Sequence, residues 1–392
     1  MTIKHAVTFE RLGVDPRLAE ELSNQGILAP FPVQALTIPD GIAGRDVCGK
    51  AKTGSGKTLA FGIPLLMRLG ECRPGFPGGL VLVPTRELAQ QVHDVMQPLA
   101  QAVDRKSVAI YGGADIEAQM KKLSKGSDIV IATPGRLIDL IDRKDISMSN
   151  VQIVVIDEAD RMADMGFLPQ VDWIMRRIEL THQTMLFSAT LDGDVNRLVK
   201  RRLTDPVFHQ VESLTTTVDS MEHRFLQVHE MDKVKVAAAI ARNSSKILLF
   251  VRTKRGADKL VDQLRKEGVR AAAIHGDLRQ TSRQRALDEF SSGKLPVLVA
   301  TDVAARGLDI DDVDVVVHYD PPEDHKAYVH RSGRTARAGD SGVVATLLLW
   351  DQIVEIERIQ KRLGLEIPVV EVFSNNPHLA DLASWNYGEG AA

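Results

Sequence analysis

This chain of 392 residues has little cysteine and no long apolar run. Its only cysteines are Cys48 and Cys72, which excludes a framework of several disulfide bonds and favours a reducing compartment. No apolar run approaches the ~20 residues that cross a bilayer. The first residues also lack the apolar core of a signal peptide. We therefore expect a cytoplasmic protein that does not insert into a membrane.

The chain also lacks a strong charge of either sign. Its net charge of −3 excludes a protein whose overall field attracts nucleic acid, so any nucleic-acid site must be a local patch. Hydrophobic residues make up 44% and charged residues 26% of the chain, which is ordinary for a globular protein. At this length we expect two or three domains, each with a core of its own.

Short apolar runs rich in β-branched residues recur along the chain, and each is followed by a polar residue and a helical pattern. The clearest runs lie at residues 78–85, 127–134, 151–158, 183–190, 246–253, 295–302 and 312–320. Their continuous apolar character predicts parallel strands that are covered on both faces, and the alternation with helices predicts α/β units. Ligands bind at the carboxyl ends of such strands, so the polar residues there are expected to gather at the site.

The strand–helix rhythm falters at residues 211–220, where the chain is polar and rich in threonine. The expected organisation is an N-terminal domain over residues 1–210, a linker over 211–220, a C-terminal domain over 221–367 and a short tail over 368–392. The two halves share a similar rhythm, but the sequence shows no short-period repeat.

The strongest local signal is AKTGSGKT at residues 51–58, between a brief strand pattern and a helical one. Its glycines let backbone N–H groups approach phosphate oxygens, and the start of the helix adds partial positive charge. Lys57 is expected to neutralise the terminal phosphates and Thr58 to bind Mg²⁺. Ala51 stands where the generic motif has glycine, so the loop departs from the general pattern there.

Three carboxylates, Asp157, Glu158 and Asp160, directly follow an apolar run. Taken alone they fit an acidic turn in contact with water, but carboxylates packed at a strand end repel one another unless a cation or ligand offsets the repulsion. A nucleoside triphosphate brings Mg²⁺, which needs a carboxylate. We expect Asp157 to hold the metal through water, Glu158 to orient or deprotonate the attacking water, and Asp160 to hold the site together.

The segment HRSGRTARAG at residues 330–339 places Arg334 and Arg337 on one face if it is helical. Two guanidinium groups suit a γ-phosphate whose charge spreads in the transition state. On spacing alone, a solvated basic helix end or a patch that binds a phosphate backbone fits as well.

Together these motifs resemble the DEAD-box family of ATP-dependent RNA helicases, from about Phe9 to Leu365. AKTGSGKT is that family's own form of the phosphate loop, which accounts for Ala51. The resemblance implies two RecA-like α/β domains, each a mainly parallel sheet flanked by helices, with a cleft between the domains. It implies an RNA-stimulated enzyme that uses ATP and Mg²⁺ to unwind or remodel RNA duplexes and RNA–protein complexes locally. We expect it to act as a monomer.

The resemblance also implies roles for individual residues. Phe9 is expected to stack on adenine, and Gln34 to hydrogen-bond the edge of the base. The expected nucleotide contacts are Phe9, Gln34, Ala51, Lys52, Thr53, Gly54, Ser55, Gly56, Lys57, Thr58 and Asp309, with Thr58 and Asp157 as metal ligands. The expected catalytic residues are Lys57, Asp157, Glu158 and the arginine fingers Arg334 and Arg337.

The same resemblance implies contacts to RNA and a set of residues that couple the nucleotide state to RNA binding. The expected RNA contacts are Pro84, Thr85, Arg86, Gly113, Thr133, Pro134, Gly135, Arg136, Arg252, Gly276, Arg283 and Thr301. These residue types fit recognition of the RNA backbone, which fixes position without reading sequence. The expected coupling residues are Ser188, Ala189, Thr190 and His330.

The chain departs from the family's pattern at Phe31, where Thr or Ser is usual in the adenine element, and at Ala163, where a larger apolar residue is usual. Three other functions stay open: a phosphate-loop switch that acts on a protein partner, a nucleotide-dependent RNA clamp, and a DNA helicase. The lack of an Asn-Lys-x-Asp guanine motif counts against a GTPase switch. The presence of Glu158, Arg334 and Arg337 counts against a clamp with vestigial turnover.

Overall fold

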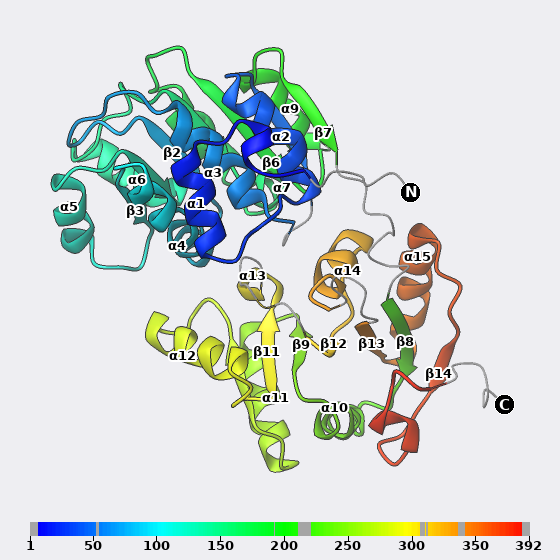
Figure 1. Cartoon of the computed structure of the whole chain (residues 1–392). Coiled ribbons are helices and arrows are strands. Elements are labelled where there is room, and N and C mark those ends of the chain that lie inside the picture. Colours follow the sequence, from blue (N-terminus) through cyan, green and yellow to red (C-terminus); the bar gives the residue numbers. More distant parts are fainter. Residues whose placement is uncertain are drawn as a thin grey trace, which may run out of the picture. The chain divides into compact units, whose positions relative to one another are not determined.

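The computed structural model describes residues 7–51, 55–191, 193–210, 221–305, 310, 313–335 and 342–385. The chain divides into two compact units, Met1–Glu212 and Ser213–Ala392, each built around its own sheet (Figure 1). The expected linker at residues 211–220 lies outside the described residues, as do Lys52, Thr53, Gly54, Asp309 and Arg337.

Among the described residues of the first unit, seven parallel strands form a sheet in the order β3-β4-β2-β5-β6-β1-β7. The strands are β1 (Val47–Lys50), β2 (Gly79–Leu82), β3 (Ser107–Ile110), β4 (Ile129–Ala132), β5 (Ile153–Ile156), β6 (Gln183–Ser188) and β7 (Val207–Gln210). The α-helices are α1 (Pro16–Asn24), α2 (Pro32–Ile42), α3 (Lys57–Arg68), α4 (Arg86–Ala102), α5 (Ile116–Ser124), α6 (Pro134–Asp142), α7 (Ala159–Asp164), α8 (Leu168–Met175) and α9 (Gly193–Arg202), and a short 3₁₀ helix, η1 (Glu10–Leu12), precedes them.

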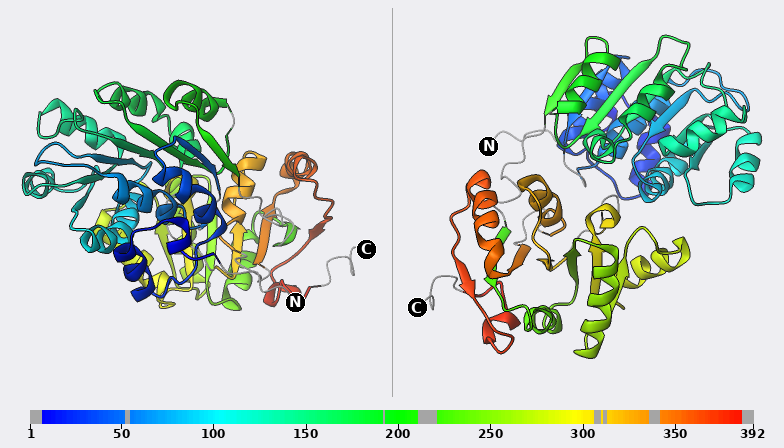
Figure 2. Two further views of the ribbon diagram at one scale, coloured as in Figure 1. Left: turned by 45° about the horizontal axis from the view of Figure 1, so that its top comes forward. Right: turned by 180° about the vertical axis from the view of Figure 1, so that it is seen from behind.

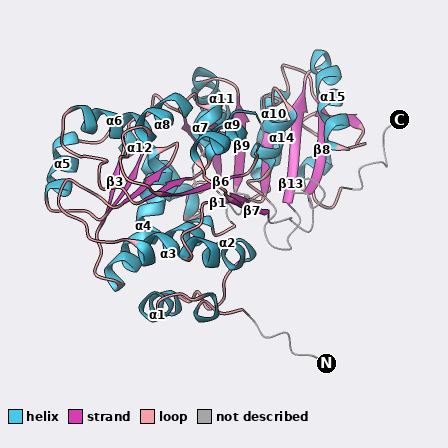
Figure 3. Ribbon diagram, turned by 90° about the horizontal axis from the view of Figure 1, so that it is seen from above, coloured by secondary structure: helices cyan, strands magenta, loops and turns pink. Residues whose placement is uncertain are grey.

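Helices cover both faces of this sheet, so its strands are buried on both sides (Figure 3). Helices α1 to α4 pack on one face and α5 to α9 on the other, each over a separate hydrophobic cluster. Neighbouring residues of one strand face opposite clusters: Val155 of β5 packs with the first set of helices, and Val154 and Ile156 pack with the second. This two-sided burial explains why the strands are continuous apolar runs rather than alternating ones.

In the described part of the second unit, seven parallel strands form a sheet in the order β10-β11-β9-β12-β13-β8-β14. The strands are β8 (Met221–Gln227), β9 (Ile247–Val251), β10 (Ala271–Ile274), β11 (Val297–Thr301), β12 (Val315–His318), β13 (Gly342–Leu348) and β14 (Val369–Glu371). The α-helices are α10 (Lys233–Arg242), α11 (Lys254–Lys266), α12 (Gln280–Ser291), α13 (Asp302–Ala305), α14 (His325–Ser332) and α15 (Ile353–Leu363), with 3₁₀ helices η2 (Trp350–Gln352) and η3 (Pro377–Ala380).

The two sheets have the same strand order. If the strands of the second sheet are counted from β8 as its first, both orders read third, fourth, second, fifth, sixth, first, seventh. The two units are therefore structural repeats of one another, although the sequence shows only a shared rhythm. The seven predicted strands are all present, and each lies inside the apolar run that predicted it.

The expected tail at residues 368–392 contributes in part to the second unit. Strand β14 pairs with β8, and η3 lies beside α10 (Figure 2). Leu379, Leu382 and Trp385 are buried in the cluster that covers this face of the sheet. Arg224 of β8 donates hydrogen bonds to the carbonyl oxygens of Leu382, at 3.0 Å, and Trp385, at 3.2 Å. Residues 369–385 therefore close the hydrophobic core, which their sparse apolar pattern did not predict.

Candidate nucleotide-binding and RNA-binding sites

The carboxyl edge of the first sheet brings together the residues expected to bind the nucleotide. Residues 51–58 follow β1, Asp157 and Glu158 follow β5, and Ser188 ends β6. These strands are neighbours in the order β5-β6-β1, and the Ala51 N–H donates a hydrogen bond to the Ser188 carbonyl at 3.0 Å. Segments that are more than a hundred positions apart in the sequence thus meet at one place.

Lys57 is held at the start of α3, directly after Gly56. Gly56 has a φ of +83°, and an added Cβ there would lie 2.6 Å from Cδ2 of Phe31, so this turn requires glycine. The Lys57 side chain is only 7% exposed, and its Nζ donates a hydrogen bond to the Ala51 carbonyl at 3.2 Å. The same Nζ lies 3.9 Å from Oδ1 of Asp157. Lys57 therefore stands between the phosphate loop and the carboxylate, where a terminal phosphate can be neutralised.

Asp157 is a buried carboxylate, and the nearby positive charge of Lys57 only partly offsets the free-energy cost of burying its negative charge. Burial, opposed by the attraction of Lys57 and reinforced by the charge of Glu158, raises its pKa from the ordinary 3.8 to about 6. In the part of the chain that the structure describes, no three His, Cys, Asp or Glu side chains form a group that could hold a metal ion. The residues fit Mg²⁺ only if one carboxylate and the Thr58 hydroxyl share the ion with phosphate oxygens and water, which is how Mg²⁺ is usually held.

The raised pKa of Asp157 predicts a pH-dependent stability. Because the folded protein binds this proton more tightly than the unfolded chain, the Asp157 charge destabilises the fold increasingly as the pH rises from 3.8 to about 6, and fully above that. In the protein without nucleotide or Mg²⁺, Asp157→Asn is therefore expected to increase the free energy of unfolding at pH 8 by at most about 3 kcal/mol. Urea denaturation at pH 5 and pH 8 measures this, with exposed Asp142→Asn as control. A gain that is larger at pH 5 than at pH 8 would contradict the assignment.

Glu158 is fixed by its backbone and by a buried ion pair. Its φ of +51° is left-handed, a conformation that costs free energy for a residue with a side chain. Its carboxylate pairs with the guanidinium of Arg161, one turn along α7, and both side chains are buried. A strained backbone at a strand end commonly marks a functional position.

Asp160 connects α7 to the end of β6. Its backbone N–H donates to Oγ of Ser188 at 3.1 Å, and its Oδ2 accepts the N–H of Thr190 at 3.1 Å. A change in the position of the acidic segment must therefore move Ser188 and Thr190, which belong to the expected coupling set.

In the adenine element, Gln34 hydrogen-bonds the phosphate loop, whereas Phe9 is packed in a hydrophobic cluster. Gln34 is 1% exposed; its Oε1 accepts the N–H of Phe31 at 2.8 Å, and its Nε2 donates to the carbonyl of Gly56 at 2.9 Å. It therefore joins the start of α2 to the phosphate loop. Phe9 is 4% exposed and belongs to the hydrophobic cluster under α1 to α4. The ring is thus covered in this structure, and its stacking on adenine stays a prediction.

The residues expected to contact RNA follow three neighbouring strands in each unit. In the first unit, Pro84–Arg86 follow β2, Gly113 follows β3 and Thr133–Arg136 follow β4, and these strands are adjacent in the order β3-β4-β2. In the second unit, Arg252 follows β9, Gly276 follows β10 and Thr301 ends β11. The order β10-β11-β9 is the equivalent part of the second sheet. The candidate RNA residues thus lie at the ends of three equivalent strands in each unit.

These residues differ in their exposure. Gly113, Gly135, Arg252 and Gly276 are exposed, Arg86, Thr133 and Arg136 are half-buried, and Pro84, Thr85, Pro134, Arg283 and Thr301 are buried. Thr85 caps α4 by accepting the N–H of Leu88 at 3.3 Å. Arg283 donates to the carbonyl of Ala304 at 2.9 Å. A direct phosphate contact from Arg283 would require this buried side chain to leave its place.

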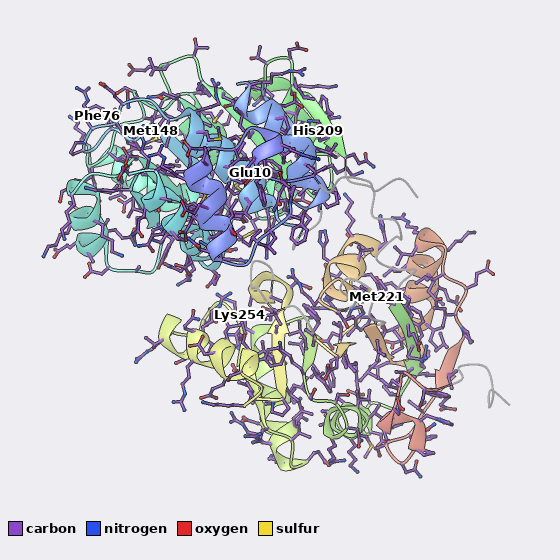
Figure 4. The ribbon with its side chains drawn as sticks, viewed as in Figure 1. Glu10, Phe76, Met148, His209, Met221 and Lys254 are labelled. Atoms are coloured by element: carbon purple, nitrogen blue, oxygen red, sulfur yellow. The ribbon has the colours of Figure 1, made fainter. Side chains whose placement is uncertain are left out.

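One cation beside the RNA edge was missed from the sequence. Lys254 is exposed and begins α11 (Figure 4). Its Nζ lies 2.6 Å from Oδ1 of Asp277. A Cβ at Gly276 would lie 3.6 Å from Cε of Lys254, so the lysine stem runs past this glycine. The sequence places Lys254 two positions after Arg252, a predicted RNA contact, which could have suggested it. Nothing else in the sequence distinguishes Lys254 from other surface lysines.

Arg331 lies in α14, and Arg334 follows the end of that helix. Helix α14 ends at Ser332, so the helical condition under which Arg334 and Arg337 would share a face is not met at Arg334. The helix stops because the next residue, Gly333, leaves the helical conformation and caps it. Arg334 is half-buried, as is the expected coupling residue His330.

Comparison with known proteins identifies the family. The DEAD/DEAH box helicase family model matches residues 31–198, and the model of the helicase conserved C-terminal domain matches residues 231–339. The chain is 41% identical over 344 residues to the DEAD-box ATP-dependent RNA helicase CshA of Bacillus subtilis, which covers 87% of this chain and 69% of that protein. This chain belongs to the DEAD-box family of ATP-dependent RNA helicases.

Further relatives and solved structures agree with this assignment. CshA of Bacillus licheniformis is 40% identical over 91% of this helicase and 74% of its own length. Saccharomyces cerevisiae Dbp5 bound to RNA and ADP BeF3 is 29% identical, with a TM-score of 0.79 over 94% of this chain and 96% of that one. A DEAD box protein from Methanococcus jannaschii is 32% identical, with a TM-score of 0.52 over 93% and 99%. The predicted family, enzyme class and fold of two helix-flanked parallel sheets are confirmed.

A buried lysine and a half-buried carboxylate of this helicase repeat the Lys57–Asp157 arrangement in the second unit. Lys233 begins α10, which follows β8, the equivalent of β1; Asp320 follows β12, the equivalent of β5. Nζ of Lys233 lies 3.8 Å from Oδ1 of Asp320, and burial lowers the pKa of the lysine. The segment between β8 and α10, VHEMD at residues 228–232, contains no glycine and is no phosphate loop.

Asp320 of this second pair accepts hydrogen bonds from Arg252 and from Arg331 of α14. Oδ2 of Asp320 accepts the backbone N–H of Arg252 at 2.8 Å, and its carbonyl accepts Nη1 of Arg331 at 2.7 Å. Arg331 is buried and holds both oxygens of Asp302, at 2.6 and 2.7 Å. Arg331 thus anchors α14, whereas Arg334 lies beyond its end.

Proposed function

We propose that this helicase hydrolyses ATP with Mg²⁺ at the carboxyl edge of the first sheet and opens short stretches of RNA duplex at the neighbouring part of that edge. The observation that carries the proposal is the division of one edge into two halves. The ends of β5, β6 and β1 hold the candidate nucleotide residues, and the ends of β3, β4 and β2 hold the candidate RNA residues. Strands β2 and β5 are neighbours, so the two halves adjoin.

In the nucleotide half, Lys57 binds the terminal phosphates. Asp157 and Thr58 would hold Mg²⁺, which would neutralise charge on the phosphate oxygens when bound. Glu158 orients the attacking water and takes its proton on the carboxylate. Arg334 and Arg337 of the second unit stabilise the charge that develops on the transferred phosphate. The support for this assignment is the short distance from Lys57 to Asp157 and the fixed position of Glu158.

In the RNA half of the first sheet's edge, backbone N–H groups near Gly113 and Gly135 approach the phosphates, and Arg86 and Arg136 add charge. At the equivalent edge of the second sheet, Gly276 and Arg252 have the same two roles. Lys254 joins this set because it is exposed beside Gly276. Ser188, Ala189, Thr190 and His330 couple the two activities. The hydrogen bonds of Asp160 to Ser188 and Thr190 support this coupling, since they tie the acidic segment to the end of β6.

A nucleotide-dependent RNA clamp is the second candidate, and it differs from a helicase only in turnover. We also propose that the protein acts as a monomer, and that it works in the cytoplasm, where its low cysteine content suits a reducing compartment.

Turnover of ATP with and without nucleic acid tests the proposed function. We expect single-stranded RNA to accelerate phosphate release at saturating ATP, and single-stranded DNA of the same sequence to do so less. Because the contacts are to phosphates, RNA affinity should fall with salt, with a logarithmic slope of about −0.7 per phosphate contact. Arg252→Gln and Lys254→Gln should each make the slope shallower. The distant Lys144→Gln serves as a control on charge. A flat salt response, or equal rates with and without RNA, would reject the proposal.

A further inference from the structure

Strand β3 forms an open edge of the first sheet, and this edge lies in a groove. Among the strands of the described residues, β4 pairs with β3 on one side and none pairs with it on the other. Helix α4 covers one face of the sheet beside β3, and α5 covers the other (Figure 3). Between the two helices, along β3, runs a groove with a volume of about 430 Å³, which is within the range of binding pockets.

The backbone groups of Ser107 and Ala109 face this groove. The carbonyls of Lys106 and Ile110 each accept a hydrogen bond at 3.0 Å from an N–H group on the β4 side. Consecutive residues of a parallel strand turn their N–H and C=O groups to opposite sides. Ser107 and Ala109, which alternate with these inward-facing residues, therefore point their donors and acceptors away from β4. An open edge of this kind is a template for pairing with another chain.

The next outward-facing residue, Tyr111, is already paired, and its partner shows what this edge binds. The Tyr111 N–H donates to Oε1 of Gln119 at 3.3 Å, and Nε2 of Gln119 donates to the Tyr111 carbonyl at 3.0 Å. Gln119 belongs to α5 and is 5% exposed. Its amide thus satisfies both backbone groups of Tyr111 as a peptide group of an added strand would. The side chain covers only this one residue of the edge.

The groove also carries positive charge, although the net charge of the chain is −3. Lys106, Lys122 and Lys125 line it and are exposed. Asp115 is the one carboxylate among the described lining residues, and it caps α5 by accepting backbone N–H groups of the first turn. An occupant with carboxylates is therefore attracted to the groove.

We propose that this groove binds an extended, acidic segment of a partner protein, which pairs with β3 as an added strand. Side chains of such a strand alternate between the two walls. Those that face α4 meet neutral polar groups, where Oγ of Ser107 lies 3.1 Å from Nδ1 of His93, and those that face α5 meet Lys122. The occupant that fits both walls alternates a carboxylate with a small polar or β-branched residue. RNA fits less well, because its backbone offers no regular series of N–H donors to the outward carbonyls of β3.

A labelled peptide that alternates threonine and glutamate tests the proposal by fluorescence anisotropy with the full-length protein. We expect saturable binding. Lys122→Glu should weaken it by roughly two- to thirtyfold, because a surface attraction becomes a repulsion of similar size. Lys121→Glu is the matched control: this neighbouring lysine of α5 is also exposed but does not line the groove, so its replacement should change the affinity far less.

Peptides that carry one methyl group on a backbone nitrogen separate strand pairing from charge attraction. Methylation removes an N–H donor and leaves the charge unchanged, and only alternate N–H groups of an added strand face β3. Affinity should therefore fall by roughly two- to tenfold at every second position and less at the others. In the complex, hydrogen exchange followed by NMR should show new protection of the Ser107 and Ala109 amides.

The possible failures are distinct from those of the proposed helicase function. An absence of saturable binding, equal losses in Lys121→Glu and Lys122→Glu, or methylation effects without the two-residue period would each overturn the inference. If single-stranded RNA displaces the peptide, and Lys122→Glu weakens RNA binding as much as peptide binding, the groove is an RNA site and the inference is likewise overturned. RNA-stimulated ATP turnover that is unchanged in Lys122→Glu, together with weaker peptide binding, supports a separate docking site.

Discussion

Replacing Glu158 by glutamine is expected to lower ATP turnover by roughly 10²- to 10⁴-fold, the usual contribution of a general base, while ATP affinity stays close to that of the wild type. Glutamine has the same shape and can still accept a hydrogen bond from Arg161, so the left-handed turn before α7 is preserved. Only the ability to take a proton from water is removed.

Lys57→Ala is the contrasting variant, since it removes a charge that is proposed to contact the phosphates in the ground state as well. A hydrogen bond to a charged group contributes about 1.5–3 kcal/mol, so nucleotide affinity should fall by roughly ten- to a hundredfold along with turnover. Calorimetric titration with ATP and single-turnover phosphate release measure the two effects separately. Equal losses of affinity in both variants would show that Glu158 and Lys57 do not have distinct roles.

The meeting of the nucleotide residues was predictable because it depends on two strong sequence signals. A parallel strand covered on both faces must be a continuous apolar run, and its carboxyl end must be polar where the chain emerges. Asp157, Ser188 and the phosphate loop were each recognisable as strand ends. The sequence does not state the strand order, but any α/β sheet gathers its carboxyl ends at one edge, so their proximity was a safe expectation.

Which of the individual side chains are exposed and which are buried could not be predicted from the sequence in the same way. Phe9 and Phe31 are both phenylalanines near a helix start, and only the packing of α1 to α4 decides which ring is covered. Arg283 and Arg331 are likewise indistinguishable from surface arginines in the sequence. The structure buries the first against the carbonyl of Ala304 and the second against Asp302. Burial of a charged group depends on a partner that is distant in sequence, which local patterns do not reveal.

The repeat of the two units was hidden for a related reason. What the units share is the order of their strands and a lysine paired with a carboxylate at equivalent ends, Lys57 with Asp157 and Lys233 with Asp320. The loops that precede the two lysines, residues 51–56 and residues 228–232, have different sequences. The loop before Lys57 contains the glycines of the proposed phosphate site, whereas VHEMD before Lys233 contains none, and this second pair supports α14 through Arg331 instead. A search for repeated residues cannot find a repeat that is preserved only in topology.

The strand geometry sets how much RNA the protein can hold, and hence how its unwinding depends on duplex length. Three neighbouring strand ends span about 10 Å, because adjacent strands lie about 4.8 Å apart. With nucleotides spaced about 3.4 Å along a stacked strand, we expect each unit to contact about three of them. One cycle of ATP hydrolysis is then expected to distort only a few base pairs, and every pair beyond these must separate without help.

Strand displacement is accordingly expected to slow steeply as the duplex lengthens, even at saturating ATP. Each further step costs about 1.4 kcal/mol on the DNA scale, which is a factor of about ten in rate if separation follows the equilibrium opening of the remaining pairs. Arg337→Ala should abolish the ATP-dependent part at every length while ATP still binds, because this residue is proposed to act only on the developing charge.

A series of RNA duplexes of increasing length, with a constant single-stranded overhang, measures this dependence. The Glu158→Gln variant provides the rate without turnover, and subtraction of that rate leaves the part that hydrolysis drives. A second series with equal length but different stability separates length from strength of pairing; local opening requires the rate to follow stability. If the rate stays constant over several helical turns, the protein must move along the strand through many successive cycles. A contact edge of three strand ends in each unit would then be only the momentary footprint of a translocating enzyme, and local opening would be rejected.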